Sequence, residues 1–334
     1  MKRVQRVGMA IIAAIALIGC DALHTAADTK LTAQGSPYEL IVVSDQAQWD
    51  GELGETMRDV FTASIPYLQQ TEPLFDVLRV TERGFNNLVT RHRNIFKTEV
   101  LPTLDSTSVV VQYDLNAAPQ IVMTLRGPSE ESLNEYLSEN SGMVVRALEM
   151  AERDRMISYA QKFGATNVES LIRKKFGFDM KVPKGYTVRN EGADFLWFSY
   201  EYPTASQGVL IYSYPATEGT LSLTQERLWQ ARNAYTSYIP GPSEGSYMTT
   251  YNDYEPEYRF FSLEGRHWAE LRGLWNVAGD YMGGPFVSYS TIDEATNMVI
   301  TIDCYVFSPK LGKRNFIRGV ENLIYNVSFP AKAE

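Results

Sequence analysis

The sequence predicts an α+β protein of two lobes, each built on a mainly antiparallel sheet packed with helices. Segments with apolar residues at helical spacing alternate with short strand-like runs along the chain. In the second half, apolar and polar residues alternate, which is typical of antiparallel strands with one solvated face. With 44% hydrophobic and 12% aromatic residues among 334, the chain can bury a large core.

The first half predicts strands separated by helices. An apolar strand at 38–43 precedes a helix that carries Leu53 and Met57 on one face and stops before Pro66. Ser129, followed by two glutamates, is a typical helix N-cap and opens a long amphipathic helical region. Further strands are expected at 75–80, 95–100, 108–113 and 120–125, and a further helix at 166–176.

The second half is rich in aromatic residues, with 15 of the 20 tyrosines and four of the five tryptophans from Tyr186 onward. A capping-box pattern at Ser222 and Gln225 predicts a helix, and an apolar stripe beginning at Phe316 predicts another at the C-terminus. Strands are expected at 186–188, 195–202, 208–214, 258–263, 266–277, 285–292 and 298–307. We therefore predict an N-terminal lobe at 37–177 and an aromatic-rich C-terminal lobe at 178–334.

The N-terminus has the layout of a secretory signal, with Lys2, Arg3 and Arg6 before an apolar run. The run of about a dozen residues is too short to cross a bilayer, which takes about 20. Leu17-Ile-Gly-Cys20 resembles the lipobox of bacterial lipoproteins, and the resemblance implies cleavage before Cys20 and acylation of that cysteine. An ordinary cleaved signal and a core helix are the alternatives.

On the lipoprotein hypothesis, residues 1–19 are the signal peptide and residues 20–36 are an acylated cysteine with a flexible tether. The stretch after Cys20 is rich in Ala, Thr, Asp and Gln and has no apolar periodicity. We expect a lipid anchor in the cell envelope, at the outer membrane. No dense acidic run follows Cys20, so the leaflet stays open.

The net charge argues against some classes of ligand. From Cys20 onward the chain has 28 basic and 40 acidic side chains, a net charge of −12. That sign argues against sequence-independent binding of nucleic acid or anionic lipid.

The second cysteine, Cys304, lies in a strand-like run without a nearby histidine or basic cluster. We therefore expect a buried core residue rather than a reactive thiol.

Three short motifs carry a family resemblance. Tyr38-Glu-Leu-Ile-Val-Val-Ser-Asp45, Arg91-His-Arg-Asn-Ile95 and Ala118-Pro-Gln-Ile-Val122 resemble a family of uncharacterised Bacteroidota lipoproteins classed as a domain of unknown function. The resemblance implies an envelope lipoprotein and supplies no catalytic residues. The segment from Phe178 to Tyr186, followed by Phe195-Leu-Trp-Phe, resembles the opening of a PsbP-like α/β sandwich. That likeness concerns fold alone.

The sequence has no clear motif for a metal site, a phosphate-binding loop or a serine hydrolase. The three histidines lack zinc-site spacing, and neither phosphate-binding glycine pattern occurs, so no metal or cofactor is expected. Gly241-Pro-Ser243-Glu-Gly245 matches the serine-hydrolase pattern, but it follows a predicted helix and Pro240, so we interpret it as a turn. The basic run Arg91-His-Arg93 indicates either an anion site or a charged strand edge.

The segment with the most distinctive composition is a run rich in tyrosines and acidic residues between 247 and 258. Aromatic faces flanked by acids and amides suit sugar rings and also suit protein interfaces. Core and rim positions of an antiparallel sheet would give the same composition. The candidate ligand-binding residues are Tyr247, Tyr251, Asp253, Tyr254, Glu255 and Trp268.

These observations favour a non-enzymatic, lipid-anchored envelope protein that binds a protein or glycan partner through its C-terminal lobe. One rival is a carbohydrate-active hydrolase using Asp253, Glu255 or Glu257, which would need two carboxyls facing each other across a cleft. The other rival is a purely structural envelope component. No catalytic residue is assigned.

Overall fold

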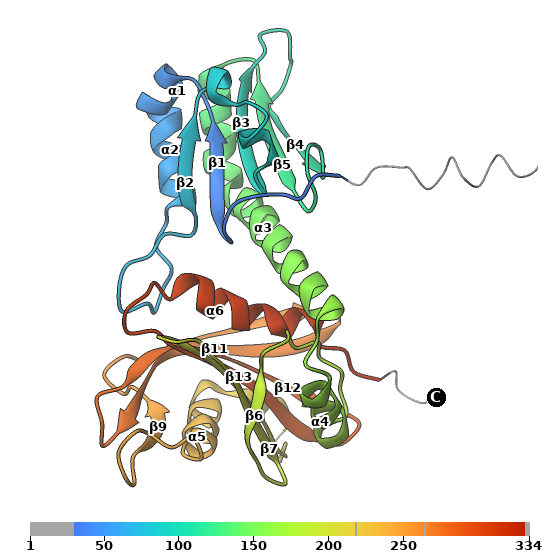
Figure 1. The fold of residues 1–334 in the computed structure, drawn as a ribbon, viewed down its shortest axis with the longest axis vertical. Helices are drawn as coiled ribbons and strands as arrows, with labels where there is room; N and C mark the ends of the chain where they lie inside the picture. The colour runs from blue at the N-terminus through green and yellow to red at the C-terminus, as the bar shows by residue number, and fades with distance from the viewer. Residues whose placement is uncertain (1–29, 218, 264, 331–334) are drawn as a thin grey trace, which may run out of the picture.

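The computed structural model describes residues 30–217, 219–263 and 265–330, and it divides them between two lobes (Figure 1). Cys20 and the predicted signal peptide lie outside the described residues. The long helix α3 (Glu130–Lys162) runs from the upper, N-terminal lobe down to the lower, C-terminal lobe. Ser129 caps it as expected, accepting the Ser132 N–H through its side chain.

A five-stranded sheet forms the N-terminal lobe, in the order β2-β1-β3-β5-β4. Its helices are α1 (Gln46–Asp50) and α2 (Glu52–Phe61), and two 3₁₀ turns, η1 (Glu82–Gly84) and η2 (Val89–Arg91), precede β3. The strands are β1 (Glu39–Val43), β2 (Asp76–Val80), β3 (Asn94–Val100), β4 (Ser108–Tyr113) and β5 (Ile121–Gly127).

The α+β class is confirmed, but the prediction of a mainly antiparallel sheet is wrong for this lobe. β1 pairs in parallel with β2 and β3, and β3 pairs in parallel with β5; only β4 is antiparallel. Parallel strands are usually buried on both faces, and β1 and β5 are almost continuously buried. Leu40 and Val42 face α2 and α3, while Ile41 and Val43 face the segment that carries η1 and η2.

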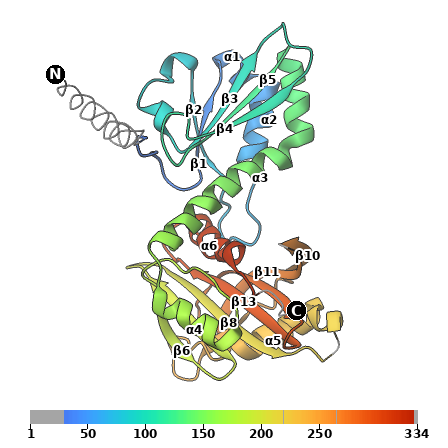
Figure 2. The same ribbon diagram turned by 90° about the vertical axis from the view of Figure 1, so that its right-hand side faces the viewer.

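An eight-stranded antiparallel sheet forms the C-terminal lobe and curls into a half-barrel, as Figure 2 shows. Its order is β10-β11-β12-β13-β8-β7-β6, with β9 added beside β11. The strands are β6 (Thr187–Glu191), β7 (Phe195–Glu201), β8 (Ser206–Pro215), β9 (Tyr247–Thr250), β10 (Glu257–Leu263), β11 (Arg266–Ala278), β12 (Gly283–Asp293) and β13 (Met298–Phe307). Here the antiparallel prediction is confirmed.

Helices cover both faces of this sheet. One face packs against α4 (Thr166–Phe176), α6 (Arg314–Glu321) and the 3₁₀ turn η4 (Asn322–Asn326). The other packs against α5 (Gln225–Thr236), which follows the 3₁₀ turn η3 (Gly219–Leu223). Cys304 lies within the first core with 1% of its surface exposed, as expected, and burial raises the pKa of its thiol well above the usual value.

The change from one core to the other falls before α4. Val168, Ile172 and Phe176 of α4 pack into the core of the C-terminal sheet. The border between the two lobes therefore lies near Gly164, so that α4 belongs to the C-terminal lobe. We predicted this border one helix later, at 177/178. Sequence pattern identifies α4 as a helix but does not say which sheet its apolar stripe covers.

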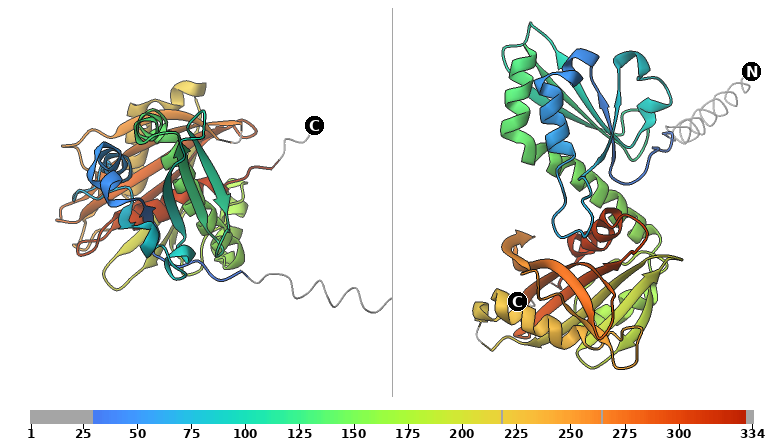
Figure 3. Two further views of the ribbon diagram at one scale, coloured as in Figure 1. Left: turned by 90° about the horizontal axis from the view of Figure 1, so that it is seen from above. Right: turned by 90° about the vertical axis from the view of Figure 1, so that its left-hand side faces the viewer.

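Helix α6 lies between the lobes, as the right-hand view of Figure 3 shows. The Glu72 carboxylate of the N-terminal lobe accepts the backbone N–H groups of Lys313 (2.6 Å) and Arg314 (3.0 Å), where α6 begins. An acid at that position also complements the helix dipole. The buried Arg314 guanidinium returns a hydrogen bond to Asp76 (3.1 Å) on β2, so α6 is held by the N-terminal lobe at its first turn.

The last residue of α6, Glu321, is the centre of a buried ionic cluster. Its carboxylate, in a side chain only 3% exposed, accepts hydrogen bonds from Arg272 (2.5 Å) and Arg318 (3.2 Å) and from the Tyr289 hydroxyl (3.1 Å). Arg318 also binds Glu149 on α3 at 2.7 Å. One carboxylate therefore links α6, the C-terminal sheet and, through Arg318, the long helix of the N-terminal lobe.

Glu321→Gln should destabilise the protein at pH 7 by about 3 kcal/mol, because it leaves Arg272 and Arg318 without their shared counter-charge. Burial alone would raise the pKa of Glu321, but the two arginines and the hydrogen bonds from Arg272 and Tyr289 outweigh it and lower the pKa to about 2. The stabilising effect is therefore complete above the ordinary value of 4.5 and is lost as the pH falls toward 2.

Urea unfolding of the Cys20→Ala chain and its Glu321→Gln variant, at several pH values from 7 to 2.5, measures this difference. The exposed Glu139 on α3 supplies the control, Glu139→Gln, which should change stability by less than about 0.5 kcal/mol. Equal effects of the two variants, or a difference independent of pH, would contradict the assignment.

Candidate functional site

The predicted binding residues do not form one cluster. Tyr251, Asp253, Tyr254 and Glu255 share the loop between β9 and β10. Tyr247 is 42% exposed and begins β9, three residues before that strand ends. Trp268 does not belong to this site: it is 2% exposed and packs in the core beside Phe329, because strand alternation turns it to the covered face of β11.

The β9–β10 loop presents two neighbouring tyrosine rings. The Tyr251 and Tyr254 rings lie 5.5 Å apart, and Tyr254 is 54% exposed. Hydrogen bonding to Asp253 and the charge of that carboxylate raise the pKa of Tyr251. The Glu255 carboxylate accepts a hydrogen bond from the side-chain amide of Gln225 on α5 at 3.1 Å. The Glu255 backbone carbonyl accepts one from the hydroxyl of Tyr67, in the N-terminal lobe, at 3.3 Å. The loop is therefore tied to both lobes.

A small hollow of about 230 Å³ adjoins this loop. Amide, carboxylate and indole groups form its walls. It is lined by Glu226, Trp229, Gln230, Asn233 and Asn252. Asn233 is held in place because its side-chain oxygen accepts the Thr250 backbone N–H at 2.9 Å. An aromatic ring among amides and an acid is a surface that a sugar ring can bind.

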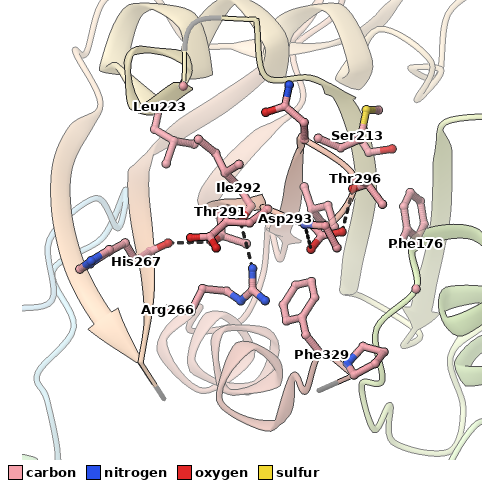
Figure 4. Close-up of a pocket in the computed structure, with 18 of the residues that line it drawn as sticks. Phe176, Ser213, Leu223, Arg266, His267, Thr291, Ile292, Asp293, Thr296 and Phe329 are labelled. Carbon is pink, nitrogen blue, oxygen red and sulfur yellow. Dashed lines mark hydrogen bonds between the residues drawn. The ribbon is translucent and has the colours of Figure 1, made fainter. Parts of the chain in front are cut away.

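A far larger cavity, about 1160 Å³, opens at the other end of β10 (Figure 4). The ends of β8, β11, β12 and β13 form it, together with the end of α4 and the C-terminal segment at Phe329 and Pro330. Its apolar lining comes from both cores of the lobe. The apolar side chains are Phe176, Leu223, Phe260, Ile292, Met298, Ile300 and Phe329.

Charged groups are placed around this apolar lining. Arg266 stacks on the Phe329 ring at 3.7 Å and donates one N–H to the Ile292 carbonyl at 2.9 Å, which fixes its guanidinium at the cavity (Figure 4). Lys174 adds a positive charge from the end of α4, whereas the ammonium of Lys175 beside it is bound to the Gly192 carbonyl at 2.6 Å and to Glu191 at 3.6 Å. Among the acids, Asp293 is engaged by its own turn, accepting the Thr296 hydroxyl at 2.7 Å. An apolar cavity with fixed cations suits an amphipathic anion.

Sequence reasoning missed this cavity. Its walls come from segments near 175, 213, 220, 266, 292 and 329, which are distant in the chain. Read singly, Lys174-Lys175 is the basic last turn of a helix and Asp293–Asn297 is a hairpin turn. Only the curl of the sheet brings these segments together.

The remaining sequence candidates take structural positions. Ser243 lies in a turn between α5 and β9 and donates its hydroxyl hydrogen bond to Asp280, as the turn interpretation predicts. His92 is 8% exposed, with its Nδ1 atom 3.1 Å from the Asn94 carbonyl and its Nε2 atom 3.6 Å from Glu39. Within residues 30–330, positions 218 and 264 excepted, no group of three or more His, Cys, Asp or Glu side chains is arranged to hold a metal.

Family models match both lobes. A two-lobed α+β protein with an apolar cavity in its second lobe is the class that the fold and site define. Residues 165–326 match the family described as Domain of unknown function (DUF4837), and residues 33–161 match Domain of unknown function (DUF8532). Each lobe is thus similar to a domain of unknown function, the class that the sequence motifs indicated, and the two matches divide where the core changes.

Other comparisons give distant similarities. A search of curated proteins found no match. Three of the solved structures that match are a point mutant of the protein Mog1 (8% identity, 45% of this chain and 89% of that chain, TM-score 0.30), LpqN of Mycobacterium tuberculosis, described as involved in cell envelope biogenesis (11%, 45% and 82%, 0.27), and a protein of Bacteroides thetaiotaomicron VPI-5482 (14%, 47% and 46%, 0.21). Similarity at this level carries no conclusion about function.

Asp253→Asn should lower the pKa of Tyr251 toward that of an ordinary tyrosine, because it removes the carboxylate that raises it. NMR titration of ring-labelled tyrosines between pH 8 and 12 measures the change. Asp154→Asn, at an exposed position of α3, is the matched control and should leave Tyr251 unchanged. An unaltered Tyr251 titration in Asp253→Asn would contradict the loop geometry.

Proposed function

We propose that this chain is a lipid-anchored protein of the cell envelope, at the outer membrane, which binds an amphipathic anion in the cavity of its C-terminal lobe. The lipobox at Leu17–Cys20 supports the anchor. Across the part of the chain that the structure describes, every helix is too short or too polar to span a bilayer. The role as a binding protein rests on the cavity.

The observation that carries the proposal is the pairing of about 1160 Å³ of space with an apolar wall and a fixed guanidinium. Cavities of several hundred Å³ with few, well-placed polar groups are typical of small-molecule sites. Burying an apolar chain against Phe176, Ile292 and Ile300 contributes about 25 cal/mol per Å². Arg266 and Lys174 would hold the anionic end, since the third cation of the lining, Lys175, already binds Glu191 at 3.6 Å.

A second candidate function is capture of a glycan or protein partner on the β9–β10 loop. The exposed Tyr254, the neighbouring Tyr251 and the hollow beside Trp229 favour it. The hydrolase alternative has less support, because Asp253, Glu255 and Glu257 line neither this hollow nor the large cavity.

Filling the cavity tests the leading proposal. Ser213 lies at the cavity wall on β8, and Ser213→Trp should weaken binding of a fluorescent polyene fatty acid at least tenfold, about 1.4 kcal/mol, by occupying its space. Arg266→Gln should weaken it less, because the apolar wall remains. Fluorescence titration of the Cys20→Ala chain gives both values.

Ser138→Trp is the control for added indole, because Ser138 is exposed on α3, away from the cavity. It should bind the probe like the parent chain. Absence of binding by the parent chain, or equal binding by Ser213→Trp, would contradict the cavity proposal.

The second candidate has its own test. Tyr251→Ala with Tyr254→Ala should abolish crosslinked capture of envelope material in intact cells without lowering the melting temperature, since both side chains lie on a surface loop. Tyr281→Ala, which alters a fully exposed tyrosine on another turn, should preserve capture. Metabolic labelling with an acyl probe, lost in Cys20→Ala, tests the anchor in the same cells. Capture that survives the double substitution would remove the loop from the proposal.

A further inference from the structure

The described chain begins docked on the N-terminal lobe. The Leu31 carbonyl accepts the Ala118 N–H at 2.8 Å, and the Ala33 N–H donates to the Ala118 carbonyl at 3.0 Å. The Gln34 N–H donates to the Arg91 carbonyl at 2.9 Å. Lys30 adds a hydrogen bond from its ammonium to the Asp114 carbonyl at 2.8 Å. Residues 30–34, which we predicted as part of the tether, are therefore fixed on this lobe.

This docking point lies at one end of the five-stranded sheet. β1, β3 and β5 are parallel and all begin there, and the antiparallel β4 ends there. The loops that precede β3 and β5 flank residues 30–34 at this end of the lobe. The structure thus fixes where any segment that precedes Lys30 must start.

Four large apolar side chains are exposed around the same point, and we term them the apolar patch. They are Leu31 (56% exposed), Leu88 (65%), Tyr113 (63%) and Leu115 (52%). Tyr113 and Leu115 flank Asp114, which binds Lys30, and Leu88 precedes Arg91, which binds Gln34. Three separate segments therefore carry exposed apolar side chains within three residues of the hydrogen bonds that hold residues 30–34. A cluster of this kind marks an interaction surface.

The length of chain before this point selects the occupant. Ten residue steps separate Cys20 from Lys30, and fully extended they reach at most about 35 Å. If Cys20 carries the acyl chains, the bilayer surface lies within about 35 Å of Lys30 and hence close to the apolar patch. Lys30 and Arg91 beside the patch are compatible with phosphate headgroups, despite the acidic balance of the whole chain.

We infer that the apolar patch is a membrane-contact surface, with Leu31, Leu88, Tyr113 and Leu115 entering the headgroup region next to the anchor. The inference rests on the proposed acylation of Cys20. An acyl anchor supplemented by an apolar contact holds the N-terminal lobe in one orientation on the bilayer, where an acyl chain on a free tether would let it rotate.

The test couples the chain that begins at Cys20 to vesicles of phosphatidylethanolamine, phosphatidylglycerol and a maleimide lipid. Cys304 is buried, so coupling occurs at Cys20, and the test does not depend on acylation in cells. Hydrogen exchange should slow about threefold or more at 86–91 and 113–118 upon coupling, relative to uncoupled chain with the same vesicles. Leu88→Ser with Leu115→Ser should remove this protection.

Leu311→Ser, at an exposed leucine of the C-terminal lobe, is the matched control and should keep the protection. Absence of protection in coupled chain would overturn the inference while leaving acylation, tested by labelling in cells, intact. Protection that appears without lipid and rises with protein concentration would also overturn it, in favour of a second copy of the chain on the patch.

Discussion

The arrangement of the two lobes depends on one buried carboxylate. Glu321 is charged although it is nearly inaccessible to solvent, because Arg272 of the sheet and Arg318 of its own helix share its charge. Arg318 also binds Glu149 on α3. Removing Glu321 from such a cluster is costly, because the two buried arginines lose the carboxylate that they share and keep only Glu270 and Glu149 as partners. Helix α6 is thus fixed at its end by charge and at its beginning by Glu72.

The same strands that hold Glu321 also form the cavity. Arg272 of β11 and Tyr289 of β12 bind the carboxylate, while Arg266 at the start of β11 and Ile292 near the end of β12 line the cavity. The Glu321 cluster and the cavity therefore share strands β11 and β12 of the C-terminal lobe.

Sequence pattern predicted the elements better than their pairing. The strands at 108–113 and 298–307 were predicted to the residue, and Cys304 is in the core as expected. The parallel pairing of β1 with β3 was missed, because a short run buried on both faces gives no alternation from which strand direction could be inferred.

The site was less predictable than the fold. Composition left open whether the tyrosines at 251 and 254 belong to a binding surface or to the core and rim of a sheet. In the structure they lie on a loop, whereas Trp268, on the second strand that follows them, is a core residue. Which face a strand residue occupies depends on register, and register is set by partners far along the chain. The cavity has no local signature at all, since its cationic and apolar walls come from six segments.

Whether the C-terminal lobe carries a small molecule in the envelope is tested most directly by native mass spectrometry of chain isolated from membranes in mild detergent. Binding in the cavity predicts a defined mass in addition to the acylated chain, lost on denaturation and absent from Ser213→Trp. The mass of the acylated chain alone, in the parent protein and the variant alike, would contradict it.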